Sequence, residues 1–227
     1  MVWNSPVGQR LPRIAICVPH METVSMKWSV EMMAPLFYTG LTWCEKIHKL
    51  IRGIPQNLAR DQLVELALQD TLVTHILFVD SDNVSNTPKD PNIALKMLYD
   101  TNMPIVSGLY RAKQAEGFNW AAWIDIHKVN PQYPADKIGF TPVSSYTGNL
   151  FTVDVIGMGF CLVKREVYEK MPKPWHPWTT PSPSEDFNFC LNAKKVGFDS
   201  WIMSDVKLDH IGQLNVKPDG TVTTLDV

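Results

Sequence analysis

Three short apolar runs mark the first half of the chain: Arg13–Pro19, Ile76–Val79 and Ile105–Leu109. Each run is continuous rather than alternating, which is typical of strands buried on both faces of a parallel sheet. Helical patterns separate the runs, and the resulting order of strand, helix, strand, helix and strand predicts an α/β fold. The central sheet should be mostly parallel and flanked by helices. Because right-handed crossovers bring the carboxyl ends of such strands to one edge, we expect a ligand site at that edge.

The segments between the strands have helical spacing. Residues 55–70 repeat apolar side chains along one face, which predicts an amphipathic helix with Asn57 as its N-cap. We also expect helical structure across residues 24–50 and a helix over Pro91–Tyr99.

The second half of the chain is less regular. Pro172–Ser184 contains five prolines, so it cannot form a helix or a central strand and is predicted to be a long functional loop. A short helix is expected at Lys164–Met171 and another at Glu185–Lys195, the latter capped by Ser184 or by a capping box formed by Ser182 and Glu185. Further strands and a terminal hairpin are expected at residues 153–156, 160–163, 198–203, 206–210 and 215–223.

Composition narrows the class of protein. With 45% hydrophobic and 19% charged residues and a net charge of −2, the 227 residues suit one globular domain and give no electrostatic footprint for nucleic acid. The four cysteines are scattered, which argues against a disulfide framework and suits a reducing compartment. The start has no signal pattern, and charged residues break the apolar stretch at 23–38, so we expect a cytoplasmic protein without a membrane span.

The strongest candidate chemistry follows the second strand. Asp80 and Asp82 stand one residue apart at its exit, where both carboxylates can face a divalent cation that is shared with substrate phosphates. The alternative is structural: Asp82 and Asn83 cap a turn while Asp80 accepts backbone amides. The position of the pair, at the end of the most apolar strand, favours metal binding.

Three other sites carry candidate functional groups. His210 ends the last predicted strand and is either a metal ligand or a structural histidine. Glu185 and Asp186 open a helix, where they serve as caps or supply a general base. Arg60, near the start of the helix at 55–70, either binds phosphate or pairs with a neighbouring carboxylate. Tyr110, which follows the third strand, is a weaker candidate for ligand contact.

Taken in order, six motifs resemble those of nucleotide-sugar-dependent glycosyltransferases with the GT-A fold, closest to family 2. The resemblance covers roughly residues 12–212. The motifs are the first strand, the arginine-bearing helix, a strand ending in Asp-x-Asp (the DxD motif), a glycine-containing strand, the helix with the acidic pair and a late histidine. They lie at Ile14–Pro19, Asn57–Gln69, Ile76–Asp82, Gly157–Glu166, Ser184–Gly197 and Asp209–Gly212.

The resemblance implies roles for individual residues. A divalent metal, Mn²⁺ or Mg²⁺, would be held by Asp80, Asp82 and His210. Asp186 or Glu185 would match the acidic pair that supplies the catalytic base in inverting members; in a retaining enzyme the same residue would position the substrate. The nucleotide sugar, a UDP- or GDP-sugar, would be bound by Pro19, His20, Glu22, Arg60, Asp80, Ser81, Gly108, Tyr110, Arg111, Met158 and Gly159. Residues 12–111 would form a nucleotide-binding half and residues 112–212 a sugar and acceptor half, followed by a hairpin or tail at 213–227.

The implied activity is metal-dependent transfer of a sugar to an acceptor hydroxyl. A sugar-phosphate nucleotidyltransferase is the main alternative, although the segment after the first strand, Pro19–Thr23, lacks the glycine-rich loop typical of that class. An inactive binding module with the same fold is a third hypothesis, disfavoured because all the acidic and histidine motif residues are present. Four tryptophans in loop-like segments either stack on sugars or anchor loops: Trp120, Trp123, Trp175 and Trp178.

Overall fold

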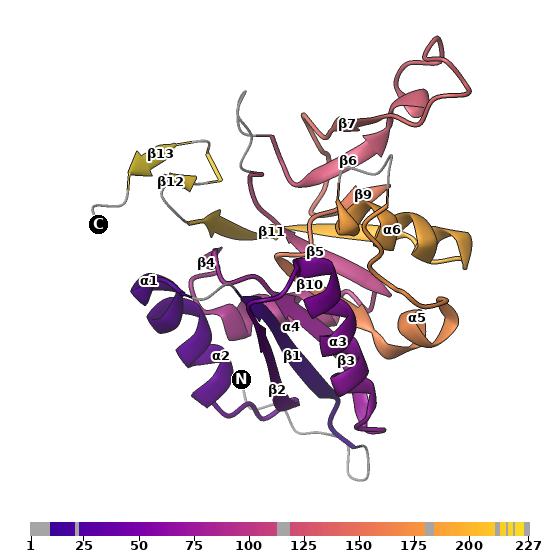
Figure 1. Cartoon of the computed structure of the whole chain (residues 1–227). Coiled ribbons are helices and arrows are strands. Elements are labelled where there is room, and N and C mark those ends of the chain that lie inside the picture. Colours follow the sequence, from indigo (N-terminus) through magenta and orange to yellow (C-terminus); the bar gives the residue numbers. More distant parts are fainter. Residues whose placement is uncertain are drawn as a thin grey trace.

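The computed structural model describes residues 10–20, 23–112, 119–179, 184–211, 214–216, 218–219 and 221–224. Its central sheet has the strand order β13-β12-β11-β5-β10-β3-β1-β2 (Figure 1). The strands on this path are β1 (Arg13–His20), β2 (Glu45–Arg52), β3 (Val73–Val79), β5 (Ile105–Leu109), β10 (Phe160–Lys164), β11 (Ser200–His210), β12 (Leu214–Val216) and β13 (Val222–Thr224).

The strand directions make the core of this sheet mostly parallel. β1 pairs in parallel with β2 and β3, and β5 pairs in parallel with β11. β10 lies antiparallel between β3 and β5, so β3 and β5 run in the same direction. The carboxyl ends of β1, β3, β5 and β11 therefore point toward one edge of the sheet, which is where ligands bind in open α/β folds.

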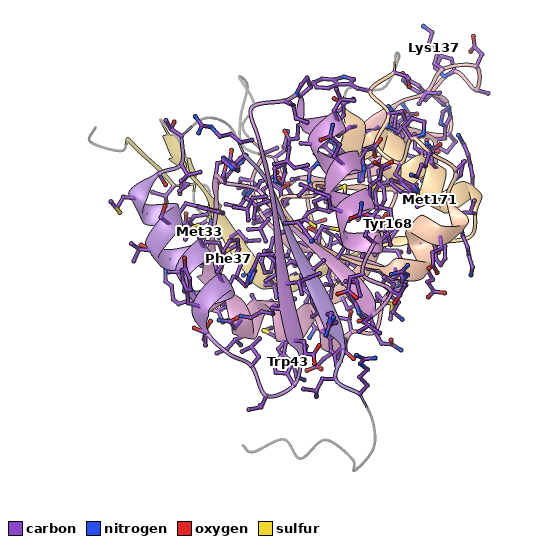
Figure 2. The ribbon with its side chains drawn as sticks, turned by 60° about the horizontal axis from the view of Figure 1, so that its bottom comes forward. Met33, Phe37, Trp43, Lys137, Tyr168 and Met171 are labelled. Carbon is purple, nitrogen blue, oxygen red and sulfur yellow. The ribbon has the colours of Figure 1, made fainter. Side chains whose placement is uncertain are left out.

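Helices cover both faces of the sheet. The helices are α1 (Met26–Trp28), α2 (Ala34–Tyr38), α3 (Gln56–Leu68), α4 (Pro91–Asp100), α5 (Arg165–Lys170) and α6 (Glu185–Lys195), with a π-helical turn at Ser29–Met33 between α1 and α2. Alternate residues of β1 enter two hydrophobic clusters, one with α3, α5 and α6 and the other with α1, α2 and α4. Figure 2 shows Tyr168 and Met171 on one side of the strands and Met33 and Phe37 on the other. The expected fold class, a single α/β domain with a mostly parallel central sheet flanked by helices, is confirmed.

A second, three-stranded sheet lies beside the central one. It has the order β7-β6-β9 and comes mainly from residues 112–150, for which no secondary structure was predicted. Its strands are β6 (Ala122–Asp125), β7 (Phe140–Pro142) and β9 (Val155–Ile156), and the remaining strands β4 (Asn83–Thr87) and β8 (Leu150–Val153) pair with β11.

Two of the predicted helical features are wrong. Residues 45–52 form the edge strand β2, not a continuation of the helical region. Ile47 and Ile51 both pack against the core, and their spacing of four residues fits a strand as well as a helix. The helix α3 begins after Pro55, so Asn57 lies inside its first turn and Pro55 holds the cap position without a side-chain cap.

Other predicted elements agree closely with the structure. α4, β5 and α6 match their expected ranges within a residue, and α6 ends at Lys195, two residues before Gly197, which has a positive φ of 92°. The expected terminal hairpin is the β12–β13 pair. The strands predicted at 198–203 and 206–210 are a single strand, β11, whose register against β5 shifts between Met203 and Lys207. Among the described residues, no helix is long and apolar enough to cross a bilayer.

Candidate active site

A cleft of about 500 Å³ opens at the carboxyl edge of the central sheet. It lies where β1, β3, β5 and β11 end and where α3 and α6 begin. Most of the residues predicted from the sequence to bind a ligand line it: Pro19, His20, Arg60, Asp80, Ser81, Asp82, Tyr110, Glu185, Asp186 and His210. The fold therefore brings together in this cleft groups that are up to 191 positions apart in the sequence, from Pro19 to His210.

Gly108 does not line this cleft, although the resemblance implied that it would. It lies inside β5, where an added Cβ would sit 2.8 Å from the side chains of Val206 and Leu208. Glycine is needed there because β11 packs closely over β5, so its role is structural. Glu22 lies outside the described residues.

Met158 and Gly159 contribute backbone groups rather than side chains to the site. The amide of Met158 donates to Asp186 Oδ2 at 3.3 Å, and the amide of Gly159 donates to the hydroxyl of Tyr110 at 3.0 Å. At Gly157, which does line the cleft, a Cβ would collide with that same hydroxyl. The turn between β9 and β10 thus packs directly beneath the cleft and holds Asp186 and Tyr110 in place.

Arg111 is directed away from the cleft. Its guanidinium lies 3.8 Å from the ring centroid of Trp120, and its Nε donates to the carbonyl of Pro218 at 3.3 Å. Only its backbone serves the site, because its carbonyl accepts a hydrogen bond from His210 at 2.8 Å.

The buried wall of the cleft is a cluster of ionic groups around Arg60. The guanidinium is 1% exposed, and its Nη2 donates to both oxygens of Asp80 at 3.2 Å. Its Nε lies 3.4 Å from Glu185 Oε1, and Nη2 lies 3.7 Å from Asp186 Oδ1. We call these four residues the Arg60 cluster. The sequence left open whether Arg60 pairs with a carboxylate or binds phosphate, and the structure pairs it with three carboxylates.

Burial and charge shift the pKa values within the Arg60 cluster. Burial alone would lower the pKa of Arg60, but the three carboxylates outweigh it and raise that pKa. Burial raises the pKa of Asp186 to about 7; Glu185 and Asp80 add to this shift and Arg60 opposes it. Burial also raises the pKa of Asp80, again against the effect of Arg60. One guanidinium cannot fully neutralise three carboxylates, so the protonated forms of Asp186 and Asp80 are favoured relative to those of an exposed aspartate.

The two carboxylate oxygens of Asp186 have different surroundings. Its Oδ2 is occupied by the Met158 amide, whereas its Oδ1 is buried and accepts no hydrogen bond from any described residue. Asp186 lies in the first turn of α6, and the elevated pKa lets the carboxylate take up and release a proton near neutral pH.

The opposite, open side of the cleft holds Asp82 and His210. Asp82 Oδ2 lies 3.1 Å from His210 Nε2, and the Asp82 side chain is 44% exposed. His210 Nδ1 lies 2.8 Å from the Arg111 carbonyl, which can only accept, so Nδ1 carries the proton. Two states satisfy this geometry: an imidazolium that donates to Asp82, or a neutral ring whose Nε2 lone pair and the carboxylate share a cation.

The Asp82–His210 pair fits a divalent metal, although it does not form a complete site. A carboxylate oxygen and an imidazole nitrogen, with the ring fixed by a backbone carbonyl, are a common donor set for Mn²⁺-like ions. No group of three or more potential metal ligands is found among the described residues, because Asp80 is turned toward Arg60. Any metal bound here would complete its coordination shell with water and ligand oxygens, as Mg²⁺ commonly does.

Sequence reasoning missed several residues that shape the site. Gln56 Nε2 donates to Asp80 at 3.3 Å, and the indole of Trp28 donates to the Asp80 carbonyl at 3.0 Å. Gln56 stands four positions before Arg60 and so shares its helix face, a spacing that would have identified it. No sequence signal marks Trp28, which reaches the site from the other side of the sheet.

Comparisons with known proteins show which fold the chain has but do not assign it to a family. No family model matches the chain, and no curated protein matches it. Among solved structures, protein A197 from STIV is similar over 96% of this chain and 95% of its own, with 18% identity and a TM-score of 0.61. At that identity the likeness shows a shared fold.

Two further solved structures have lower TM-scores. GalNAc-T7 with UDP, GalNAc and Mn²⁺ is similar over 89% of this chain and 44% of its own, with 12% identity and a TM-score of 0.47. An apo UDP-glucose pyrophosphorylase is similar over 88% of this chain and 76% of its own, with 9% identity and a TM-score of 0.46. The described chain is therefore an α/β domain that shares its fold with the STIV protein.

Proposed function

We propose that this protein is a metal-dependent glycosyltransferase that moves a sugar from a nucleotide-diphosphate donor to an acceptor hydroxyl. The observation that carries the proposal is the arrangement of one cleft. A metal-compatible pair, Asp82 and His210, lines its open side, and a buried carboxylate with a raised pKa, Asp186, lines its inner wall. The GT-A resemblance of the sequence motifs assigns the same roles to the same residues.

In the proposed reaction each group has a separate task. A divalent metal held by Asp82 and His210 would supply positive charge to the diphosphate of the donor. Asp186 takes the proton of the acceptor hydroxyl as the new bond forms between that oxygen and the sugar C1 and the bond from C1 to the phosphate oxygen breaks. Arg60 and the Met158 amide hold the carboxylate in place, and its side chain is 18% exposed at the cleft, where the acceptor hydroxyl is proposed to approach.

The nucleotide end of the donor is proposed to lie along Pro19, His20 and Ser81. These residues line the cleft at the ends of β1 and β3, next to Asp82. In open α/β sheets, nucleotides bind at the carboxyl ends of the parallel strands, which supports this placement.

The direct test is an assay for donor turnover. The protein is incubated with Mn²⁺ and a panel of UDP- and GDP-sugars, and release of nucleoside diphosphate is measured with and without metal chelation. Metal-dependent release from at least one donor is expected, and Asp82→Ala should abolish it. Release of pyrophosphate from a nucleoside triphosphate and a sugar phosphate would instead establish nucleotidyl transfer. Absence of both binding and turnover with every donor would favour a binding module.

A further inference from the structure

The structure divides the four loop tryptophans into anchors and cleft residues. Trp175 is 3% exposed and donates through its indole to the Tyr168 carbonyl at 3.0 Å, so it anchors the proline-rich loop. Trp120 is buried under the Arg111 guanidinium. Trp178 and Trp123 line the cleft instead, and Trp178 is 58% exposed.

The loop that carries Trp178 is held firmly against two helices. The backbone amide and ring Nδ1 of His176 lie 2.9 and 2.8 Å from Asp61 Oδ1 on α3. The side-chain amide of Asn188 on α6 donates to the Pro177 carbonyl at 2.7 Å. Trp178 therefore directly follows two residues that are anchored to α3 and α6, and its side chain is exposed at the cleft.

These anchors also locate Trp178 relative to the reacting groups. Asn188 is two positions after Asp186 on α6, so the loop meets α6 in the turn that carries the candidate base. The nucleotide-binding positions proposed above lie on β1 and β3, in a different wall of the cleft. An aromatic surface beside the base is thus on the side where an acceptor hydroxyl must approach.

We infer that Trp178, together with Trp123 in the lining of the same cleft, forms a platform for a pyranose ring, and that the acceptor is therefore a carbohydrate. A fixed aromatic ring offers a large, rigid apolar face that suits the apolar face of a pyranose. The direction of the acceptor hydroxyl toward Asp186 rests on the proposed glycosyl transfer. The binding of a sugar at Trp178 does not depend on that reaction.

Trp123 is placed to form the second wall of the platform. It lies on β6 with its ring 4.9 Å from that of Phe187, the residue that follows Asp186. The same α6 turn is therefore in contact with the element that carries Trp123 and with the loop that carries Trp178. A sugar ring between the two indoles would lie next to the carboxylate of Asp186.

Saturation-transfer NMR measures this binding without any turnover. Methyl glycosides of glucose, galactose, mannose and N-acetylglucosamine serve as probes, and uridine tests the alternative that the platform holds a nucleobase. At least one glycoside should receive saturation on the protons of one ring face. Trp178→Ala should weaken its affinity about tenfold or more, and Trp178→Phe should restore part of it because a ring face is retained.

A matched control distinguishes the platform from any exposed aromatic residue. Tyr38 on α2 is 81% exposed and lies outside the residues that line the cleft, so Tyr38→Ala should bind the glycoside as the wild type does. The inference is overturned if no glycoside receives saturation, if Trp178→Ala binds as well as the wild type, or if uridine alone depends on Trp178. Failure of donor turnover in the earlier assay would refute glycosyl transfer but leave this binding result intact.

Discussion

The two aspartates of the Asp-x-Asp motif are one residue apart and have opposite surroundings. Asp80 is turned inward, where both of its oxygens contact the 1%-exposed guanidinium of Arg60. Asp82 is turned outward, 44% exposed, and lies against His210 Nε2. If β3 continued, Asp80 and Asp82 would point to the same face, because alternate residues of a strand share a face. The chain instead turns after Val79, before β4 begins at Asn83.

The difference indicates which charged groups are neutralised by the protein itself and which are not. In the Arg60 cluster, the guanidinium is surrounded by three carboxylates and a backbone carbonyl, so no ligand is required to neutralise it. In the Asp82–His210 pair, both groups are electron-rich whenever the imidazole is neutral, so a cation is favoured between or beside them. The Arg60 cluster, which we call the inner side, is therefore held in place by its own ion pairs. The Asp82–His210 pair, which we call the outer side, is where a ligand would contribute charge.

The largest effect is expected at the inner side, on the reaction itself. Asp186→Asn keeps an acceptor for the Met158 amide but removes the base, so sugar transfer should fall by about 10²–10⁴-fold. Transfer is measured as the initial rate with a saturating donor and the acceptor found for the wild type. Asp136→Asn, on the surface away from the cleft, is the control and should transfer at the wild-type rate. An Asp186→Asn variant with full activity would move the base to Glu185 or another group.

The pH dependence of transfer provides a second measure of the same residue. Burial raises the pKa of Asp186 to about 7, and Arg60, Glu185 and Asp80 are the charged groups that face it. A base must be deprotonated to act, so kcat/KM should fall about tenfold per pH unit below pH 7 and level off above it. A rate that is flat from pH 5 to 8 would contradict the assignment.

Loss of the central cation should be the largest effect on stability. Arg60→Met leaves three carboxylates buried without their counter-charge, and the free energy of unfolding should fall by about 3–5 kcal/mol. Arg13 is the matched control because it also pairs with two carboxylates, Glu45 and Asp70, but at the surface. Arg13→Met should change stability little. Urea unfolding of both variants checks this, and equal losses would mean that the Arg60 cluster is not specially dependent on its cation.

The outer side is tested by comparing the two aspartates directly. Asp82→Asn should weaken Mn²⁺ binding in the presence of UDP by about tenfold or more, whereas Asp80→Asn should have a smaller effect because Asp80 is held by Arg60. Electron paramagnetic resonance of free Mn²⁺ gives both affinities. An equal loss of affinity in Asp80→Asn would mean that Asp80 leaves Arg60 when the metal binds. The difference between the two aspartates would then hold only for the ligand-free protein.

The sequence predicted the framework of the fold because its strands and helices are locally consistent. The buried strands are continuous apolar runs, and α6 carries an acidic first turn and a glycine stop, so local signals and tertiary structure agree. β4 was missed because it is short and polar, and β2 was missed because the spacing of Ile47 and Ile51 also fits a helix; both are specified as strands by pairing with β11 and β1. Edge pairing of this kind has no periodic signature.

The sequence predicted which residues line the cleft better than it predicted which of them contact one another. Strand ends and a helix start identified Asp80, Asp82, Asp186 and His210 as cleft residues, because parallel strands bring such positions to one edge. Which carboxylate pairs with Arg60 depends on side-chain directions after the strand, and this is set by packing against Gly159 and Trp28. Gly108 was expected to contact the ligand, but the structure shows that a glycine is needed there because the side chains of β11 pack closely against β5.

Removal of the candidate base is also predicted to raise the stability of the fold above neutral pH. In the folded state the pKa of Asp186 is about 7, above the value of an aspartate in the unfolded chain, so the stabilising contribution of its proton is complete at pH 4 and is lost as pH rises to 7. Asparagine mimics the protonated acid and loses nothing over this range. Asp186→Asn should therefore unfold with nearly the same free energy as the wild type at pH 4 and be more stable at pH 8, by up to about 4 kcal/mol because each pKa unit corresponds to about 1.4 kcal/mol. Thermal or urea unfolding at both pH values measures this. A variant that is less stable than the wild type at pH 8 would show that ionised Asp186 contributes net stabilisation through Arg60, and the inner cluster would then be built for stability rather than for proton transfer.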